Sequence, residues 1–167
     1  MYEFPPFKIL FGTFHVYDLR NLLAMLYPFD KQYDEAARFV KSVAKRLGTP
    51  GDLEHAVRVL RSVFGVLRRR IVPDESLQLI SKLPLFLKGI YVDGWSIYEP
   101  LSEARTLDEF LFEVRNNSQG RTYLDFSNVE LAKKKIIAVF NVLKQFVYDG
   151  ELADILRGLS TEMSDMA

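Results

Sequence analysis

The sequence VFGVL at residues 63–67 recurs as VFNVL at residues 139–143, 76 positions further along the chain. The same offset pairs residues of similar character on both sides of this stretch: Ala56 with Ala132, Leu60 with Ile136, Glu75 with Glu151, Leu79 with Ile155, and Leu83 with Leu159. A repeated helical unit cannot bury its apolar face alone, so we expect two copies to share one core.

The first matched stretch lies in a predicted amphipathic helix. Its apolar residues form a continuous stripe at helical spacing: Ala56, Leu60, Phe64, Leu67 and Ile71. Asp52 is placed to cap this helix after a break at residues 48–51, and Pro73 ends it. Pro84 is expected to break or kink the helical stretch that follows.

The second half of the chain carries the clearest helix starts. Thr106 with Glu109 and Ser127 with Glu130 both fit the capping box, in which a hydroxyl and a carboxylate satisfy backbone N–H groups reciprocally. The loop between Asn116 and Asn128 is longer than its counterpart in the first half.

These patterns predict an all-α fold, a helical bundle built from a duplicated three-helix unit with approximate two-fold symmetry. Residues 31–167 form one domain, with copy one at about residues 31–95 and copy two at about residues 104–167. Residues 1–30 lie outside the repeat and predict an aromatic arm followed by a short helix.

The predicted arm is unusually apolar. It holds eight of the 22 aromatic residues: Tyr2, Phe4, Phe7, Phe11, Phe14, Tyr17, Tyr27 and Phe29. So apolar a segment is expected to be covered. Docking over the core of the same chain is the first expectation, and docking on a second copy to form a homodimer is the alternative.

Composition and charge describe an ordinary soluble domain. The chain has no cysteine, which excludes disulfides and thiolate metal sites, and no apolar run near the roughly 20 residues of a membrane span. We expect a cytoplasmic protein. The net charge is zero, but residues 31–71 carry a net of +6 and residues 92–130 a net of −5. Such asymmetry can steer partners or promote head-to-tail self-association, but two solvated faces of opposite charge within one domain are the favoured explanation.

No catalytic or metal-binding constellation is evident. The two histidines are His15 and His55, and Asp52 with His55 lacks the further ligands that a zinc site needs. Glu109 and Glu113 lie one turn apart among other acids, which favours a solvated face over an acid–base pair. We therefore predict no catalytic residue, no cofactor and no metal, and the sequence leans away from an enzyme.

Arginines form the strongest feature unrelated to folding. Arg58, Arg61, Arg68 and Arg69 share one side of the helix that contains VFGVL and predict a basic face. The preceding helix adds Lys41, Lys45 and Arg46. Guanidinium groups presented in this way suit phosphates, but a net charge of zero is unlike that of typical nucleic-acid binders.

A second candidate surface closes the first copy. Tyr91 and Trp95 flank the turn at Asp93 and Gly94. Such aromatic residues usually fill the seam between packed units, but Trp and Tyr are also enriched at binding hot spots. Tyr91, Asp93 and Trp95 are thus the candidate interaction patch.

Three stretches together resemble a known family. They are LQLISKLPLFLKGIYVDGW at residues 77–95, VLRSVFGVLR at residues 59–68 and DEFL at residues 108–111. The first resembles the signature of the bacterial domain-of-unknown-function 2267 family, and the likeness covers roughly residues 34–163. The resemblance implies a helical domain and supplies no catalytic residues.

The function favoured by these observations is a non-enzymatic protein-interaction or assembly module. Nucleic-acid binding through the arginine face is one alternative. Carriage of a small apolar ligand between the two copies is the other.

Overall fold

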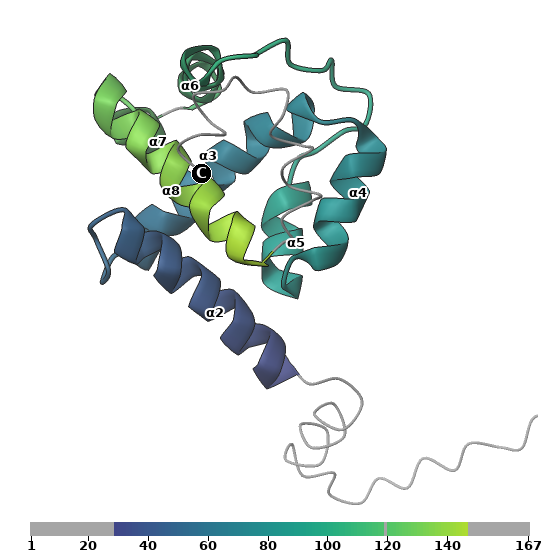
Figure 1. Cartoon of the computed structure of the whole chain (residues 1–167), viewed down its shortest axis with the longest axis vertical. Helices are drawn as coiled ribbons and strands as arrows, with labels where there is room; N and C mark the ends of the chain where they lie inside the picture. The colour runs from purple at the N-terminus through teal and green to yellow at the C-terminus, as the bar shows by residue number, and fades with distance from the viewer. Residues whose placement is uncertain (1–28, 119, 147–167) are drawn as a thin grey trace, which may run out of the picture.

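The computed structural model describes residues 29–118 and 120–146, and every regular element in this part is a helix (Figure 1). The elements are α2 (Phe29–Arg46), α3 (Leu53–Arg70), α4 (Pro73–Lys82), α5 (Leu85–Val92), α6 (Leu107–Asn116), α7 (Arg121–Asp125) and α8 (Val129–Phe146). The all-α prediction is confirmed. The predicted arm was placed at residues 1–30, but Phe29 and Asp30 begin α2. The rest of the arm and the predicted last helix of copy two, with Glu151, Ile155 and Leu159, lie outside the described residues.

Helix α3 is the centre of the fold. It packs against α2, α5, α6, α7 and α8, and Figure 1 shows α8 crossing it while α2 runs below both. Its predicted stripe is buried, and Val59, Val63 and Val66 widen the buried surface because several neighbours surround the helix. Each fully buried large side chain contributes about 1.5–3 kcal/mol relative to an exposed one. The core therefore depends on α3 more than on any other described helix.

The predicted helix starts are correct in two places. Asp52 caps α3, and its Oδ1 accepts a hydrogen bond from the His55 backbone N–H at 2.8 Å. Thr106 and Glu109 form the complete capping box of α6.

The predicted capping box at Ser127 is wrong by one residue. Helix α8 begins at Val129, and Asn128 Oδ1 accepts from the Leu131 N–H at 2.9 Å. The Ser127 hydroxyl instead donates to the carbonyl of Leu124, at the end of α7. The serine closes the preceding helix, which the sequence pattern did not predict.

Pro84 divides the stretch after α3 into two helices. Leu83 is extended (φ −72°, ψ 145°) because the residue before a proline is driven out of the helical region. Helix α5 can then turn back, and it packs on both α2 and α3. This return places the end of α5 next to the arginines of α3.

The long loop of the second half contains a helix of its own. Helix α7 begins after Gly120, whose φ of 58° lies in the left-handed region that glycine adopts most readily. It packs against α3. Thr122 of this helix lines a cleft on the surface of α3.

Candidate functional site

The four predicted arginines of α3 line one cleft. Its volume is about 650 Å³, and α3 contributes Val57, Arg58, Arg61, Ser62, Gly65, Arg68 and Arg69. The opposite side consists of Glu99 and Pro100, from the chain after α5, with Asn117, Ser118 and Thr122 around the end of α6 and the start of α7. The four arginines lie together on α3, but they surround a hollow and do not form an open basic face.

Two of these arginines are held by carboxylates. Arg58 Nε donates to Asp125 Oδ2 at 3.0 Å, and this hydrogen bond is the main cause of the raised pKa of Arg58. Arg69 Nη2 donates to Glu113 Oε2 at 3.1 Å. The arginine side chains are only 24% and 22% exposed. The solvated face predicted for Glu113 is therefore wrong, because its carboxylate forms a partly buried ion pair.

The other two arginines are less neutralised. Arg61 Nη2 lies 3.6 Å from Asp93 Oδ2, and both side chains are about 60% exposed, so this ion pair is weak. Arg68 Nη1 donates to the carbonyls of Tyr91 and Asp93, at 3.0 and 2.7 Å. Burial lowers the pKa of Arg68, and its Nε is buried without a hydrogen-bond partner among the described residues.

The patch predicted at Tyr91, Asp93 and Trp95 is only partly a surface. Tyr91 is fully buried, its OH lies 3.0 Å from Ser76 Oγ, and burial raises its pKa to about 12. The prediction that Tyr91 belongs to an exposed patch is wrong, because α5 turns its ring into the core. Trp95 is half-buried and packs edge-on against Tyr91. Asp93 is exposed and joins this patch to the cleft through Arg61 and Arg68.

The lysines of α2 do not extend the cleft. Lys41 and Lys45 line a separate hollow of about 700 Å³. The basic residues of α2 and α3 are thus divided between two places, and Arg46, at the end of α2, is exposed.

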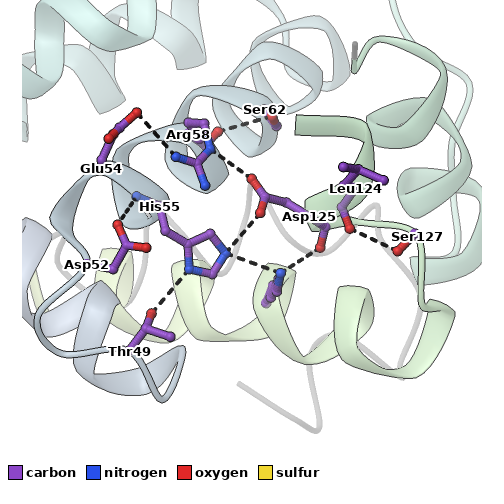
Figure 2. Close-up of polar contacts among 10 residues, drawn as sticks. Thr49, Asp52, Glu54, His55, Arg58, Ser62, Leu124, Asp125 and Ser127 are labelled. Carbon is purple, nitrogen blue, oxygen red and sulfur yellow. Dashed lines mark hydrogen bonds and ion pairs between the residues drawn. The ribbon is translucent and has the colours of Figure 1, made fainter. Parts of the chain in front are cut away.

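A polar cluster, shown in Figure 2, connects α7 with α3 and α8. The Asp125 carboxylate accepts the hydrogen bond from Arg58 Nε, and its Oδ1 lies 3.4 Å from His55 Nε2. Lys135 Nζ donates to the Asp125 carbonyl at 2.6 Å and lies 3.2 Å from His55 Nε2. On the other side of the ring, His55 Nδ1 lies 3.2 Å from Thr49 Oγ1. One acidic residue therefore holds three basic groups together.

The cluster has the connectivity of a hydrolytic triad, but its surroundings do not support that chemistry. Thr49, His55 and Asp125 follow one another as hydroxyl, imidazole and carboxylate. None of the three lines the arginine cleft, and Lys135 is within hydrogen-bond distance of the same ring nitrogen as Asp125. The arrangement instead fixes α7, which carries Thr122, against α3.

Sequence reasoning missed Asp125 and Lys135. They lie 67 residues from Arg58 and 80 residues from His55, respectively, in the pairs just described. No local spacing signals contacts over such separations. Within the described residues, no group of three or more His, Asp or Glu side chains is placed to hold a metal ion.

Acid should weaken the fold through His55. Burial, and then the charge of Lys135, lower the pKa of His55 below its ordinary 6.5, although Asp125 opposes them. The unfolded chain therefore takes up this proton first, so stability is lost as the pH falls through and below about 6.5. Replacing His55 by asparagine should reduce this loss, as measured by urea midpoints at about pH 7.5 and pH 5.5. An unchanged pH dependence in the variant would contradict the assignment.

The described part of the chain is all-helical and carries a polar, arginine-lined cleft. None of the helices in the described part of the chain has the length and apolar character that a membrane crossing requires. The chain belongs to a family described as uncharacterized conserved protein (DUF2267), whose profile matches residues 36–166. Comparison with curated proteins found no significant match.

Proposed function

We propose that this domain is a non-enzymatic protein-interaction module that binds its partner in the arginine-lined cleft of α3. The observation that carries the proposal is the convergence of four guanidinium groups from one helix on one hollow. Three of them are held by Asp125, by Glu113 and by two carbonyls of the α5 end. Groups fixed before binding lose less conformational entropy when a partner arrives, which favours affinity.

The residues beside the cleft also suit a protein partner. Ile97, Tyr98 and Leu101 are exposed next to Glu99 and Pro100, which line the cleft. On the other side, Tyr123 and Leu124 are exposed next to Thr122. Arginine and tyrosine are enriched at the centres of protein interfaces.

Nucleic-acid binding is less well supported by the charges. The four arginines are accompanied by four carboxylates, since Asp93, Glu113 and Asp125 pair with three of them and Glu99 lines the cleft. A phosphate backbone binds by displacing counterions from a surface with excess positive charge. An apolar ligand is also a poor match, because guanidinium, carboxylate and hydroxyl groups line the hollow.

Affinity capture from a native lysate tests the proposal. Arg61 is the variant site, because it lines the cleft and is 61% exposed, so its change to glutamate leaves the core intact. Arg38→Glu is the matched control, since Arg38 is an exposed arginine of α2 outside this cleft. We expect the same nuclease-resistant proteins with the original chain and with the control, and about tenfold less with Arg61→Glu, as for the loss of about 1.4 kcal/mol.

The outcome that would contradict the proposal is equally specific. Proteins that disappear after nuclease treatment, together with recovered nucleic acid and a steep dependence on salt, would assign the arginines to nucleic-acid binding. Equal capture of partner proteins by Arg61→Glu and Arg38→Glu would show that the cleft does not bind the partner.

We further propose that the domain is a duplicated three-helix unit. In support, α3 and α8 each have 18 residues and begin 76 positions apart, at Leu53 and Val129. The first helices differ more, since α2 has 18 residues and α6 has 10. The two-fold symmetry, the bacterial and cytoplasmic setting and the homodimer through the N-terminal arm stay predictions of the sequence.

A further inference from the structure

Gly65 occupies an unusual position in the middle of α3. It lines the arginine cleft, and apart from its chain neighbours and the surrounding backbone of α3, a Cβ added there would meet no described atom within 4 Å. Glycine inside a helix is destabilising relative to alanine, and α3 is the central helix of this fold. Close packing in the described part of the chain therefore gives no reason for a glycine here. The position leaves bare helix backbone open to the cleft.

Arginines flank this bare position on both sides. Arg61 lies one turn before Gly65, and Arg68 and Arg69 lie one turn after it, at the spacings that bring helix residues side by side. Arg69 Nε donates to the Gly65 carbonyl at 3.3 Å, which confirms that this guanidinium folds back beside the glycine. A group that enters at Gly65 thus finds guanidinium groups from both neighbouring turns.

Two of these guanidinium groups have capacity for a ligand. Arg68 has no carboxylate within ion-pair distance among the described residues, and it is fixed by two carbonyls. Arg61 is held only by its long, exposed contact with Asp93. Guanidinium groups bind the oxygens of carboxylates and phosphates in pairs, with short charge-assisted hydrogen bonds.

We propose that Gly65, Arg61 and Arg68 form an oxyanion seat, in which a carboxylate or phosphoryl group of an acidic partner segment docks against the backbone of α3. This inference rests on the proposed function and names the chemical group that the partner presents. Glu99 lines the same cleft and disfavours a second negative charge, so the seat takes one oxyanion and not a continuous polyanion.

The glycines offer a matched pair of variants. Gly89 lies in α5, is exposed and also has open space around its would-be Cβ. Alanine at either position should raise the urea midpoint, because alanine is the better helix former. Leucine is also a good helix former, and at Gly65 it fills the seat, whereas at Gly89 it projects from a different helix. A loss of binding in Gly65→Leu, with a urea midpoint no lower than that of the original chain, is then not a loss of folding.

Backbone amide shifts of the full-length chain provide the direct test, with phosphate, phenyl phosphate and acetate as probes at constant ionic strength. We expect saturable shifts centred on residues 61–69, at least about tenfold weaker binding in Gly65→Leu, and unchanged binding in Gly89→Leu. Shifts that persist in Gly65→Leu, or that spread equally over the basic residues of α2, would overturn the seat.

The capture experiment separates this inference from the proposed function. If both Arg61→Glu and Gly65→Leu fail to capture the partner, the result supports the interaction module and the oxyanion seat. Loss with Arg61→Glu alone overturns the seat and leaves the interaction module standing, whereas no loss with either overturns the module itself. Phosphatase treatment of the lysate identifies the source of the oxyanion, since it abolishes capture only when the group is a phosphoryl ester.

Discussion

Replacement of Tyr91 by alanine is expected to destabilise the protein by about 3–5 kcal/mol, the largest effect of any substitution considered. The ring is fully buried and lies edge-on to Phe64, at a centroid distance of 5.4 Å, and to Trp95, at 6.1 Å. Its removal leaves a cavity at the junction of α3 and α5. It also leaves the buried Ser76 hydroxyl without the Tyr91 OH that it pairs with.

Urea unfolding followed by circular dichroism measures this effect, with Tyr98→Ala as the control. Tyr98 is 89% exposed, so its substitution should change the free energy of unfolding by no more than about 0.5 kcal/mol. Tyr91→Phe should give an intermediate loss of stability, because it keeps the ring and removes only the hydroxyl. Similar stabilities for Tyr91→Ala and Tyr98→Ala would show that Tyr91 is not a core residue.

Replacement of Asp125 by alanine is the second large effect, expected at about 2–4 kcal/mol. The Asp125 side chain is 14% exposed and pairs with Arg58 and His55. Without it, the positive charges of Arg58 and Lys135 repel one another with no acid between them. We expect a smaller loss of stability than for a fully buried ion pair, because Arg58 is 24% exposed and water screens part of its charge.

Asp108→Ala is the control for Asp125. Asp108 Oδ1 lies 2.6 Å from Lys133 Nζ, but the Asp108 side chain is 63% exposed. Its replacement by alanine should therefore lower the free energy of unfolding by at most about 1 kcal/mol. Asp125→Ala should also loosen α7 and thereby weaken binding in the cleft, which Thr122 lines. If Asp125→Ala were as stable as Asp108→Ala, the polar cluster around Asp125 would not be what holds α7 against α3.

Local patterns predicted much of this fold correctly. The stripe of α3, the cap at Asp52 and the capping box of Thr106 all depend on residues within one or two turns of each other. Predictions failed where one residue served a different neighbour. Ser127 bonds backward to Leu124, and Asn128 takes the cap of α8, although both residues are reasonable caps by type.

The grouping of the four arginines was predictable from the sequence, but the shape of the surface around them was not. A helical projection placed Arg58, Arg61, Arg68 and Arg69 together on one side of α3, and that grouping is correct. The projection could not show that Glu113 and Asp125 would hold two of them, because those acids come from α6 and α7. It also could not place Glu99 and Asn117 opposite the helix, where they turn an exposed face into a cleft.

The central position of α3 has a consequence for amide hydrogen exchange. Five of the six other described helices pack on α3, so its amides can exchange only when most of these contacts open together. Helix α3 therefore both lines the cleft and packs against most of the other described helices. A ligand that binds there should slow exchange in α2, α5 and α8, which do not line the cleft, by the same factor as in α3 itself.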